Sequence, residues 1–318
     1  MNKILLLCAV FMFVTFSSFK TETLPKDPTE TLIYNGRERK YLIHLPITYD
    51  ESISYPLVIA LHGGNGKAKK FNKSTRYRFN QLSDTEGFII VYPQGVDKSW
   101  NDNKNRNDYG EARNKNIDDV GFIETLIEKL EATYTIDSSN IFACGISNGG
   151  LMSATLATKL PNKIKAIGMV SSNFSKAHLE EMRAEPPKPF SIIIIQGTED
   201  PIFPYSEGEI SFFKQRRGKI IGAEKSISFM IALNKSNEEG IITNLPNLAP
   251  FDNCISTKTI YSNGKNPNLK IALIKINGGG HTWPGGHQYL PKKIIGLVTK
   301  DFNAADKLWE FFKSTIEK

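Results

Sequence analysis

Cysteine is scarce in this sequence: it occurs 3 times in 318 residues, and Cys8 lies in an apolar segment at the N-terminus. Only Cys144 and Cys254 remain beyond that segment. A small scaffold held by several disulfides is therefore excluded, while a single bond between these two stays open. The sequence also contains no C-x-x-C and no H-E-x-x-H motif. We therefore expect neither a metal site nor a cofactor.

Internal repeats and linkers rich in Pro, Ser or Thr are absent as well, which indicates one folded domain over residues 21–318. The net charge is +7. The basic residues are spread along the chain apart from short groups such as "KQRRGK" at 214–219, so a nucleic-acid partner is not expected. The sequence carries no signal for the oligomeric state.

Residues 1–20 have the pattern of a secretory signal peptide. Lys3 precedes an apolar run over 4–16, which is too short for a comfortable membrane span, and small and polar residues follow it. The bulky Leu7 before Cys8 argues against a lipid-modified cysteine. We expect cleavage near 17–20 and export to the periplasm or the extracellular space, with no stable membrane association afterwards. An uncleaved membrane anchor is the alternative.

Near-continuous apolar runs separated by helical patterns predict the fold class. Runs of this kind fit strands that are buried on both faces of a sheet. Amphipathic spacing over 119–134 and 304–316 predicts helices. Strands that alternate with helices favour a doubly wound, mostly parallel α/β sheet with helices on both faces, with chemistry at the carboxyl ends of the strands. The predicted strands are 41–46, 56–63, 88–93, 140–145, 164–172, 191–197 and 270–276.

The segment "IFACGISNGG" (141–150) places Ser147 between an apolar run and a helical pattern. It fits G-x-S-x-G, in which a serine stands on a sharp strand-to-helix turn and glycines allow the close approach of the backbone. Such a turn exposes the hydroxyl, so Ser147 is a candidate nucleophile. The motif also occurs by chance in ordinary glycine-rich loops, so the remaining members of a catalytic group must be sought elsewhere.

A nucleophilic serine needs a base and an acid that orients the base. The strand predicted at 191–197 runs into a turn that contains Asp200, where a carboxylate could accept the imidazole N–H. Glu199 is the neighbouring rival. Asp118 and Asp119 are further rivals, but they stand at a helix start, where they can serve as N-terminal caps. Asp200 is therefore the candidate acid.

The candidate base is His281, in "INGGGHTWPGG" directly after the strand predicted at 270–276. Three glycines precede it and allow the loop to fold closely over the serine turn. His287 in the same loop is the fallback. The other histidines lack this combination of glycine-rich flanks and a position between the last predicted strand and the last predicted helix.

Backbone amides that stabilise an oxyanion are expected at two places. One is the N–H of Asn148, directly after the serine. The second should come from the turn "LHGGNG" (61–66), where Gly64 is the first candidate and Gly63 the next. His62 is expected to shape this loop. The turn does not qualify as a phosphate-binding loop, because the earlier glycine and the Ser/Thr ligand of that motif are missing.

Four aromatic residues lie in loops expected at the same edge of the sheet: Trp100, Phe203, Tyr205 and Trp283. They are candidates for a substrate-binding wall that would receive a sugar ring or a feruloyl group. They could equally close the core beneath the loops, and the sequence leaves both readings open.

The ordered motifs "LHGGNG", "VYPQG", "IDDVGFI", "GISNGG", "GTEDPIFPY" and "GGGHTWPGG" resemble the secreted α/β-hydrolase esterases that include polyhydroxybutyrate-depolymerase-like enzymes and the feruloyl and acetylxylan esterases. The similarity runs from about Tyr34 to the C-terminus. It implies an α/β-hydrolase catalytic domain over 21–318. The chain departs from the family at Gly64, where members often carry cysteine, and it has fewer cysteines, so shared disulfides are not implied.

The resemblance implies a serine esterase with Ser147 as nucleophile, Asp200 as acid and His281 as base. The order of these residues along the chain is that of α/β-hydrolases. The implied substrates are small esters or acylated polysaccharides, with feruloyl or acetyl groups on plant polysaccharide as the first expectation. A depolymerase of hydroxyalkanoate oligomers is the alternative. A peptidase of the same fold, or an exported binding protein without activity, is more remote. The motif "DDVGF", which recurs among members of the family, suggests that Asp119 fixes a neighbouring loop by accepting backbone hydrogen bonds.

Overall fold

The computed structural model describes residues 27–102, 111–213 and 215–317. The predicted signal peptide therefore lies outside the described residues. Within them, ten strands form one mixed sheet in the order β1-β2-β4-β3-β5-β6-β7-β12-β11-β10, and β8 pairs with β9 in a separate ribbon. The strands are β1 (Thr29–Tyr34), β2 (Arg37–His44), β3 (Tyr55–Leu61), β4 (Ile89–Pro93), β5 (Ile136–Ile146), β6 (Ala166–Val170), β7 (Ser191–Gly197), β8 (Gly208–Phe212), β9 (Gln215–Ile220), β10 (Ile241–Asn244), β11 (Ile255–Ser262) and β12 (Lys270–Asn277).

The centre of the sheet is parallel from β4 through β3, β5, β6 and β7 to β12. Both flanks are antiparallel, β1 and β2 on one side and β11 and β10 on the other. Every residue of β7 is buried, as a strand covered on both faces requires. The seven predicted strands are all present. Strands β1, β10 and β11 and the β8–β9 ribbon were not predicted, because their residues are largely polar or only partly buried.

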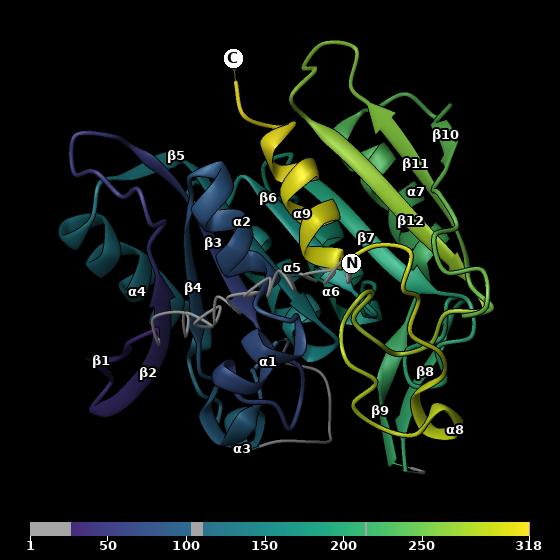
Figure 1. Ribbon diagram of the computed structural model, residues 1–318, viewed down its shortest axis with the longest axis horizontal. Helices are drawn as coiled ribbons and strands as arrows, with labels where there is room; N and C mark the ends of the chain where they lie inside the picture. Colours follow the sequence, from purple (N-terminus) through teal and green to yellow (C-terminus); the bar gives the residue numbers. More distant parts are fainter. Residues whose placement is uncertain (1–26, 103–110, 214, 318) are drawn as a thin grey trace, which may run out of the picture.

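Helices cover the sheet in two layers (Figure 1). The side chains of α1, α2 and α9 pack on one face, with Phe312 of α9 stacked on Phe142 of β5. The side chains of α4, α5, α6 and α7 pack on the other face. The helices are α1 (Ala68–Ser74), α2 (Arg78–Glu86), α3 (Glu111–Asn114), α4 (Asp119–Thr133), α5 (Asn148–Lys159), α6 (Lys176–Ala184), α7 (Ala223–Asn234), α8 (Lys292–Ile295) and α9 (Ala304–Lys313), with a 3₁₀ turn at Val96–Lys98.

The start of α4 shows two neighbouring aspartates in different roles. Asp118 is the N-cap and accepts a hydrogen bond from the Gly121 amide at 2.9 Å, as its position predicted. Asp119 is instead buried and forms an ion pair with the equally buried Arg39 of β2 at 2.6 Å. Its second oxygen accepts the Asn101 amide at 2.8 Å. Asp119 therefore ties β2 to the loop after β4, in addition to its place in the helix.

Cys144 and Cys254 are both buried free thiols, so they form no disulfide. Burial raises the pKa of the Cys144 thiol far above its ordinary value, which makes this group unreactive. None of the helices in the described ranges is long and apolar enough to cross a membrane. The same ranges hold no group of three or more His, Cys, Asp or Glu side chains placed to bind a metal ion.

We predict that Asp119→Asn lowers the free energy of unfolding by about 3–5 kcal/mol, because it leaves the buried guanidinium of Arg39 without a counter-charge. Urea unfolding followed by circular dichroism measures this. The matched control is Lys40→Gln, which breaks the exposed pair of Lys40 with Glu38 and should change stability by less than about 0.5 kcal/mol. Equal losses of stability in the two variants would contradict the prediction that the buried Arg39–Asp119 pair is costlier to break than an exposed pair.

Candidate active site

Ser147 stands on a strained turn between β5 and α5. Its backbone has φ 57° and ψ −120°, a conformation that side-chain-bearing residues rarely adopt. The Ser147 amide donates to the carbonyl of Val170 on β6 at 2.9 Å, which holds the turn against the neighbouring strand. The strand, the turn and the helix follow one another as the G-x-S-x-G pattern predicted.

The two glycines of the pattern are required by close packing. A Cβ on Gly145 would lie 2.6 Å from the carbonyl oxygen of Leu61 on β3. A Cβ on Gly149 would overlap that same oxygen and also approach the carbonyl of His62. The first turn of α5 therefore sits directly against the carboxyl end of β3, and this contact places Ser147 beside the loop that follows β3.

Asp200 and His281 form a buried pair at the carboxyl ends of β7 and β12. The Nδ1 atom of His281 lies 2.9 Å from Oδ2 of Asp200. Oδ1 of Asp200 accepts the amides of Ile202 and Phe203 at 2.9 and 2.8 Å. These amides fix the carboxylate, and the carboxylate in turn fixes the orientation of the imidazole.

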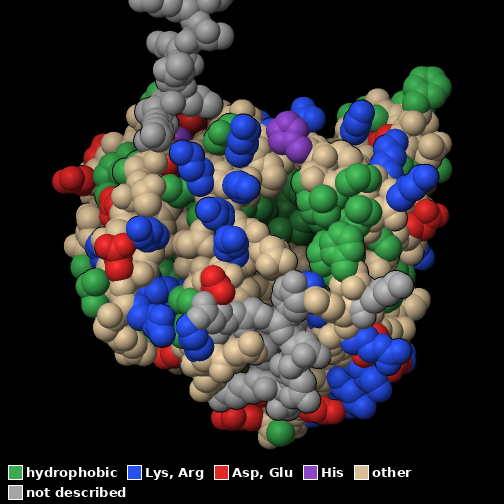
Figure 2. Space-filling view, turned by 90° about the horizontal axis from the view of Figure 1, so that it is seen from below, with side chains coloured by type: hydrophobic (Ala, Val, Ile, Leu, Met, Phe, Trp, Pro, Cys, Tyr) green, Lys and Arg blue, Asp and Glu red, His purple; other side chains and the backbone are tan. Residues whose placement is uncertain are grey.

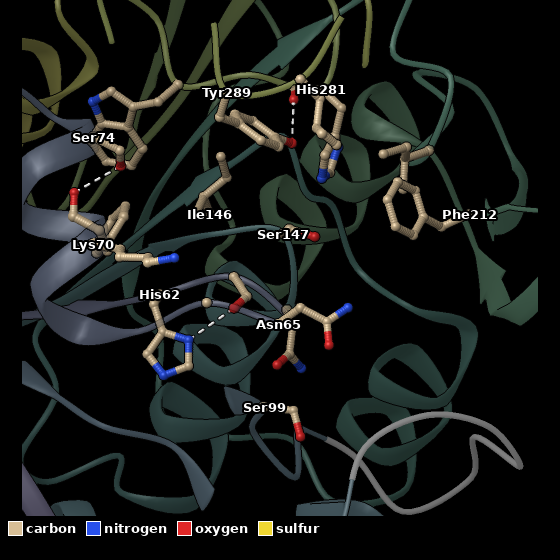
Figure 3. Close-up of a pocket in the computed structure, with 18 of the residues that line it drawn as sticks. His62, Asn65, Lys70, Ser74, Ser99, Ile146, Ser147, Phe212, His281 and Tyr289 are labelled. Atoms are coloured by element: carbon tan, nitrogen blue, oxygen red, sulfur yellow. Dashed lines mark hydrogen bonds between the residues drawn. The ribbon is translucent and has the colours of Figure 1, made fainter. Parts of the chain in front are cut away.

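Two further contacts hold His281, one to its ring and one to its backbone. Phe203 stacks on it, with centroids 5.5 Å apart and planes 16° from parallel. Tyr289 donates its hydroxyl to the backbone carbonyl of His281 at 2.9 Å. Figure 3 shows the ring of His281 directed toward the side chain of Ser147, and both residues line one pocket. The structure thus places the Asp200–His281 pair and the candidate nucleophile Ser147 at one pocket, with Nδ1 of His281 on the candidate acid.

The loop after β3 is shaped by His62, as the sequence suggested. Its Nδ1 lies 2.8 Å from the carbonyl of Gly63, and its Nε2 lies 3.0 Å from the Gly95 amide and 3.1 Å from the side-chain amide of Gln94. These partners require a proton on Nδ1 and none on Nε2, so the ring is neutral. Burial lowers the pKa of His62 to about 4, although the bond to the Gly63 carbonyl acts in the opposite direction. His62 is therefore a fixed support for the loop.

The two candidate oxyanion donors, Gly64 and Asn148, both line the pocket beside Ser147. A Cβ on Gly64 would lie 3.8 Å from the Cβ of Asn148, so these backbones are neighbours. Asn148 is the first residue of α5, where an amide has no intrahelical partner. Gly63, the second choice, lies closer to Ile146 and Ser147.

The side chain of Asn148 is anchored in three directions. Its Oδ1 accepts the Trp100 amide at 2.8 Å, and its Nδ2 donates to the Trp100 carbonyl at 3.2 Å and to Asp102 at 2.6 Å. The Asn101 amide donates to Asp119, and the adjacent Trp100 binds Asn148. The loop that contains Trp100 and Asn101 therefore contacts both the Arg39–Asp119 pair and the first turn of α5. No feature of the sequence signalled this role for Asp102.

The pocket has a volume of about 440 Å³, a size typical of small-molecule sites. Of the four predicted aromatic residues, Phe203 and Trp283 line it. Trp283 also packs edge-on against Phe71 of α1.

The structure does not place Trp100 or Tyr205 in the pocket wall. The Trp100 indole is fully buried and donates to the carbonyl of His62 at 2.9 Å, so it supports the loop from beneath. The Tyr205 hydroxyl donates to Glu224 at 2.6 Å, on the side of α7. Trp100 and Tyr205 therefore fit the alternative in which these aromatic residues close the core beneath the loops.

The rivals for acid and base differ from Asp200 and His281 in their surroundings. Glu199 is exposed, whereas Asp200 is buried. His287 is exposed and lines the pocket. His178 is buried against Ser175 and Thr155 at the start of α6, away from the pocket-lining residues. His44 lies between two aspartates near β2.

Residues 40–183 match the model of the family described as Esterase PHB depolymerase. The matched part contains Ser147, His62 and the buried Asp119, and it ends before Asp200. NocK of Nocardia uniformis subsp. tsuyamanensis, provisionally named an esterase, is 24% identical over 88% of this chain and 80% of its own length. Feruloyl esterase B of Piromyces equi is 25% identical over 76% of this chain, but the match spans only 42% of that enzyme.

Among solved structures, the acetyl xylan esterase from Aspergillus awamori superimposes with a TM-score of 0.58 over 90% of this chain and 99% of its own. The sequences are 15% identical, so this likeness concerns the fold. The chain thus has the α/β-hydrolase fold, as its motifs indicated, and its similarity to this group of esterases is confirmed.

We predict that Gly149→Ala lowers the free energy of unfolding by roughly 3 kcal/mol or more, because the new methyl group meets backbone that cannot move aside. Thermal unfolding checks this. Gly264→Ala is the matched control, since no atom lies closer than 4.0 Å to its Cβ and its stability should be unchanged. A Gly149→Ala protein as stable as the control would refute the close contact with Leu61.

We predict that the His62 ring remains neutral between pH 8 and 5, because its pKa of about 4 lies below the ordinary 6.5. The unfolded chain binds a proton at His62 more readily than the folded protein does. The contribution of the neutral ring to the free energy of unfolding is therefore complete above pH 6.5 and is lost as the pH falls toward 4. Histidine NMR resonances followed against pH test this. His44 is the contrast: burial favours its neutral form, but bonds to Asp27 and Asp84 outweigh burial and raise its pKa. A His62 midpoint near 6.5 would contradict the prediction.

Proposed function

We propose that this chain, a relative of the polyhydroxybutyrate-depolymerase-type and feruloyl esterases, hydrolyses carboxylic esters with Ser147, His281 and Asp200. The single observation that carries the assignment is the buried Asp200–His281 pair in the same pocket as the strained Ser147. Ser147, Asp200 and His281 follow β5, β7 and β12, and with these partners they have no common structural task other than the activation of the serine.

In the first step, Nε2 of His281 takes the proton of the Ser147 hydroxyl while the oxygen attacks the ester carbonyl. Asp200 accepts the hydrogen bond from Nδ1–H of His281 and stabilises the imidazolium that forms. The imidazolium then protonates the leaving alcohol, which leaves an acyl-enzyme on Ser147. Water repeats the sequence, and the carboxylic acid departs.

The negative charge on the carbonyl oxygen would be held by the amides of Gly64 and Asn148. These donors are set before the substrate arrives, because His62 fixes the loop of Gly64 and Trp100 fixes the side chain of Asn148. Amides that need no reorganisation are the most effective form of this stabilisation, and the loss of one donor typically costs roughly 10²–10³ in turnover.

The first candidate substrates are feruloyl or acetyl esters on plant polysaccharide, since feruloyl esterase is the name of several relatives. Phe203 and Trp283 would then contact an aromatic acyl group or a sugar ring. Hydroxyalkanoate oligomers are the second candidate, which the description of the matched family favours. We further propose that residues 1–20 direct export and are removed, and that 21–318 form one catalytic domain.

We predict that Ser147→Ala lowers kcat by roughly 10⁴–10⁶, because the remaining groups cannot form an acyl-enzyme. Asp200→Asn should lower kcat by roughly 10⁴, since the imidazole loses its orienting acceptor. The substrates are an aryl acetate, methyl ferulate and a short 3-hydroxybutyrate oligomer, and their relative rates choose between the substrate classes.

Ser138→Ala is the control for these variants, because Ser138 is exposed on the same strand as the turn and should retain full activity. Circular dichroism confirms that each variant is folded. Turnover that persists in Ser147→Ala would overturn the assignment of the nucleophile. Failure of the wild type on all three esters would overturn the proposed esterase function.

A further inference from the structure

The two sides of the pocket differ in chemistry. Figure 3 shows Lys70 on one side of Ser147 and Phe212 on the other. Lys70 lies in α1, and Lys67 is the residue that precedes this helix; both line the pocket. Phe212 shares strand β8 with Ile210, and Ile202, Ile210 and Phe212 all contribute to the apolar lining of the pocket. Figure 2 shows the same contrast, with basic side chains gathered along one side of a hollow and hydrophobic side chains along the other.

Lys67 and Lys70 have no acidic partner among the residues that the structure describes. In the described part of the chain, neither amine forms an ion pair or a hydrogen bond to a carboxylate. Asp97 is the one acidic side chain among the described residues that line the pocket, and it is exposed. Arg217 also lines the pocket, but its guanidinium lies over the Phe212 ring at 5.1 Å and belongs to the apolar side.

A basic wall beside an apolar wall favours a ligand that has an anionic part and an apolar part. An anion placed near Lys67 and Lys70 gains attraction without displacing an existing partner, whereas a purely apolar ester gains nothing on that side. Neither lysine has a role in the proposed proton transfers. The two amines can therefore act on substrate choice without taking part in the chemistry.

We infer that the pocket prefers esters whose acyl or alcohol part carries a carboxylate, such as esters of a dicarboxylic acid or of a hydroxy acid, with the carboxylate held by Lys67 and Lys70. This inference rests on the proposed esterase function and narrows its substrates. It does not depend on the overall charge of +7, because it assigns the effect to two positions in the pocket.

The test compares wild type with the Lys67→Gln/Lys70→Gln double variant on two matched pairs of esters. Mono-4-nitrophenyl adipate and 4-nitrophenyl hexanoate differ by a carboxylate on the acyl side. 4-Acetoxybenzoate and 4-methylphenyl acetate differ by a carboxylate on the alcohol side. Each ratio of variant to wild type is taken on one substrate, so differences in intrinsic reactivity cancel.

We expect the double variant to lose about four- to ninefold in kcat/KM on at least one acidic ester, about two- to threefold for each exposed lysine. The loss should appear in KM, with kcat little changed, and the neutral esters should change less than about twofold. The pair that responds tells which part of the ester faces the lysines. In 0.5 M salt the loss should shrink to within about twofold, because exposed charges are screened.

Lys69→Gln/Lys73→Gln is the matched control. It removes the same charge from exposed positions of the same helix that do not line the pocket, so it reports any effect of overall charge. Equal losses in the two double variants, or none in either while neutral esters are hydrolysed, would overturn the inference and leave the esterase function standing. Failure of the wild type on all four esters would overturn both.

Discussion

The packing of the first turn of α5 onto the carboxyl end of β3 is the contact on which the site depends. At Gly145 and Gly149 the backbone approaches the carbonyl of Leu61 so closely that no side chain fits. This approach forces Ser147 into its strained conformation and sets the amide of Asn148 beside the loop that contains Gly64. Strain of this kind persists only where the surroundings determine the backbone fully. The parallel strands on both sides of β5 supply that constraint.

Buried polar groups extend this constraint away from the serine. Arg39 holds Asp119, Asp119 holds the amide of Asn101, and the adjacent Trp100 holds the side chain of Asn148. Each of these groups is costly to bury without a partner. The network therefore fixes residues 100–102 in one arrangement, and this arrangement supports Asn148, one of the candidate oxyanion donors. The neutral His62 has the same function for the loop after β3.

The hydrophobic pattern of the sequence was sufficient to predict the buried strands at the centre of the sheet, but it gave little signal for the strands at the edges. The run 191–197 coincides with β7 because every residue of that strand is buried. All four residues of β10 are exposed, Ile241 and Ile242 included, so the hydrophobic pattern does not follow burial there. The β1–β2 hairpin could have been found, since Asn35 and Gly36 both have the positive φ that a two-residue turn requires. The Asn-Gly pair itself, which is typical of such turns, was the evidence for the hairpin in the sequence.

The sequence by itself determined the α/β class, the serine turn and the candidate acid and base, because each depends on local features: apolar runs, glycines and the residues that follow a strand. Only the tertiary structure decided which carboxylate meets the imidazole, since Asp200 and the exposed Glu199 are neighbours in the chain. It also decided that Trp100 supports a loop while Lys70 lines the pocket. Which side a loop residue faces is set by contacts between distant segments, and these leave no local pattern.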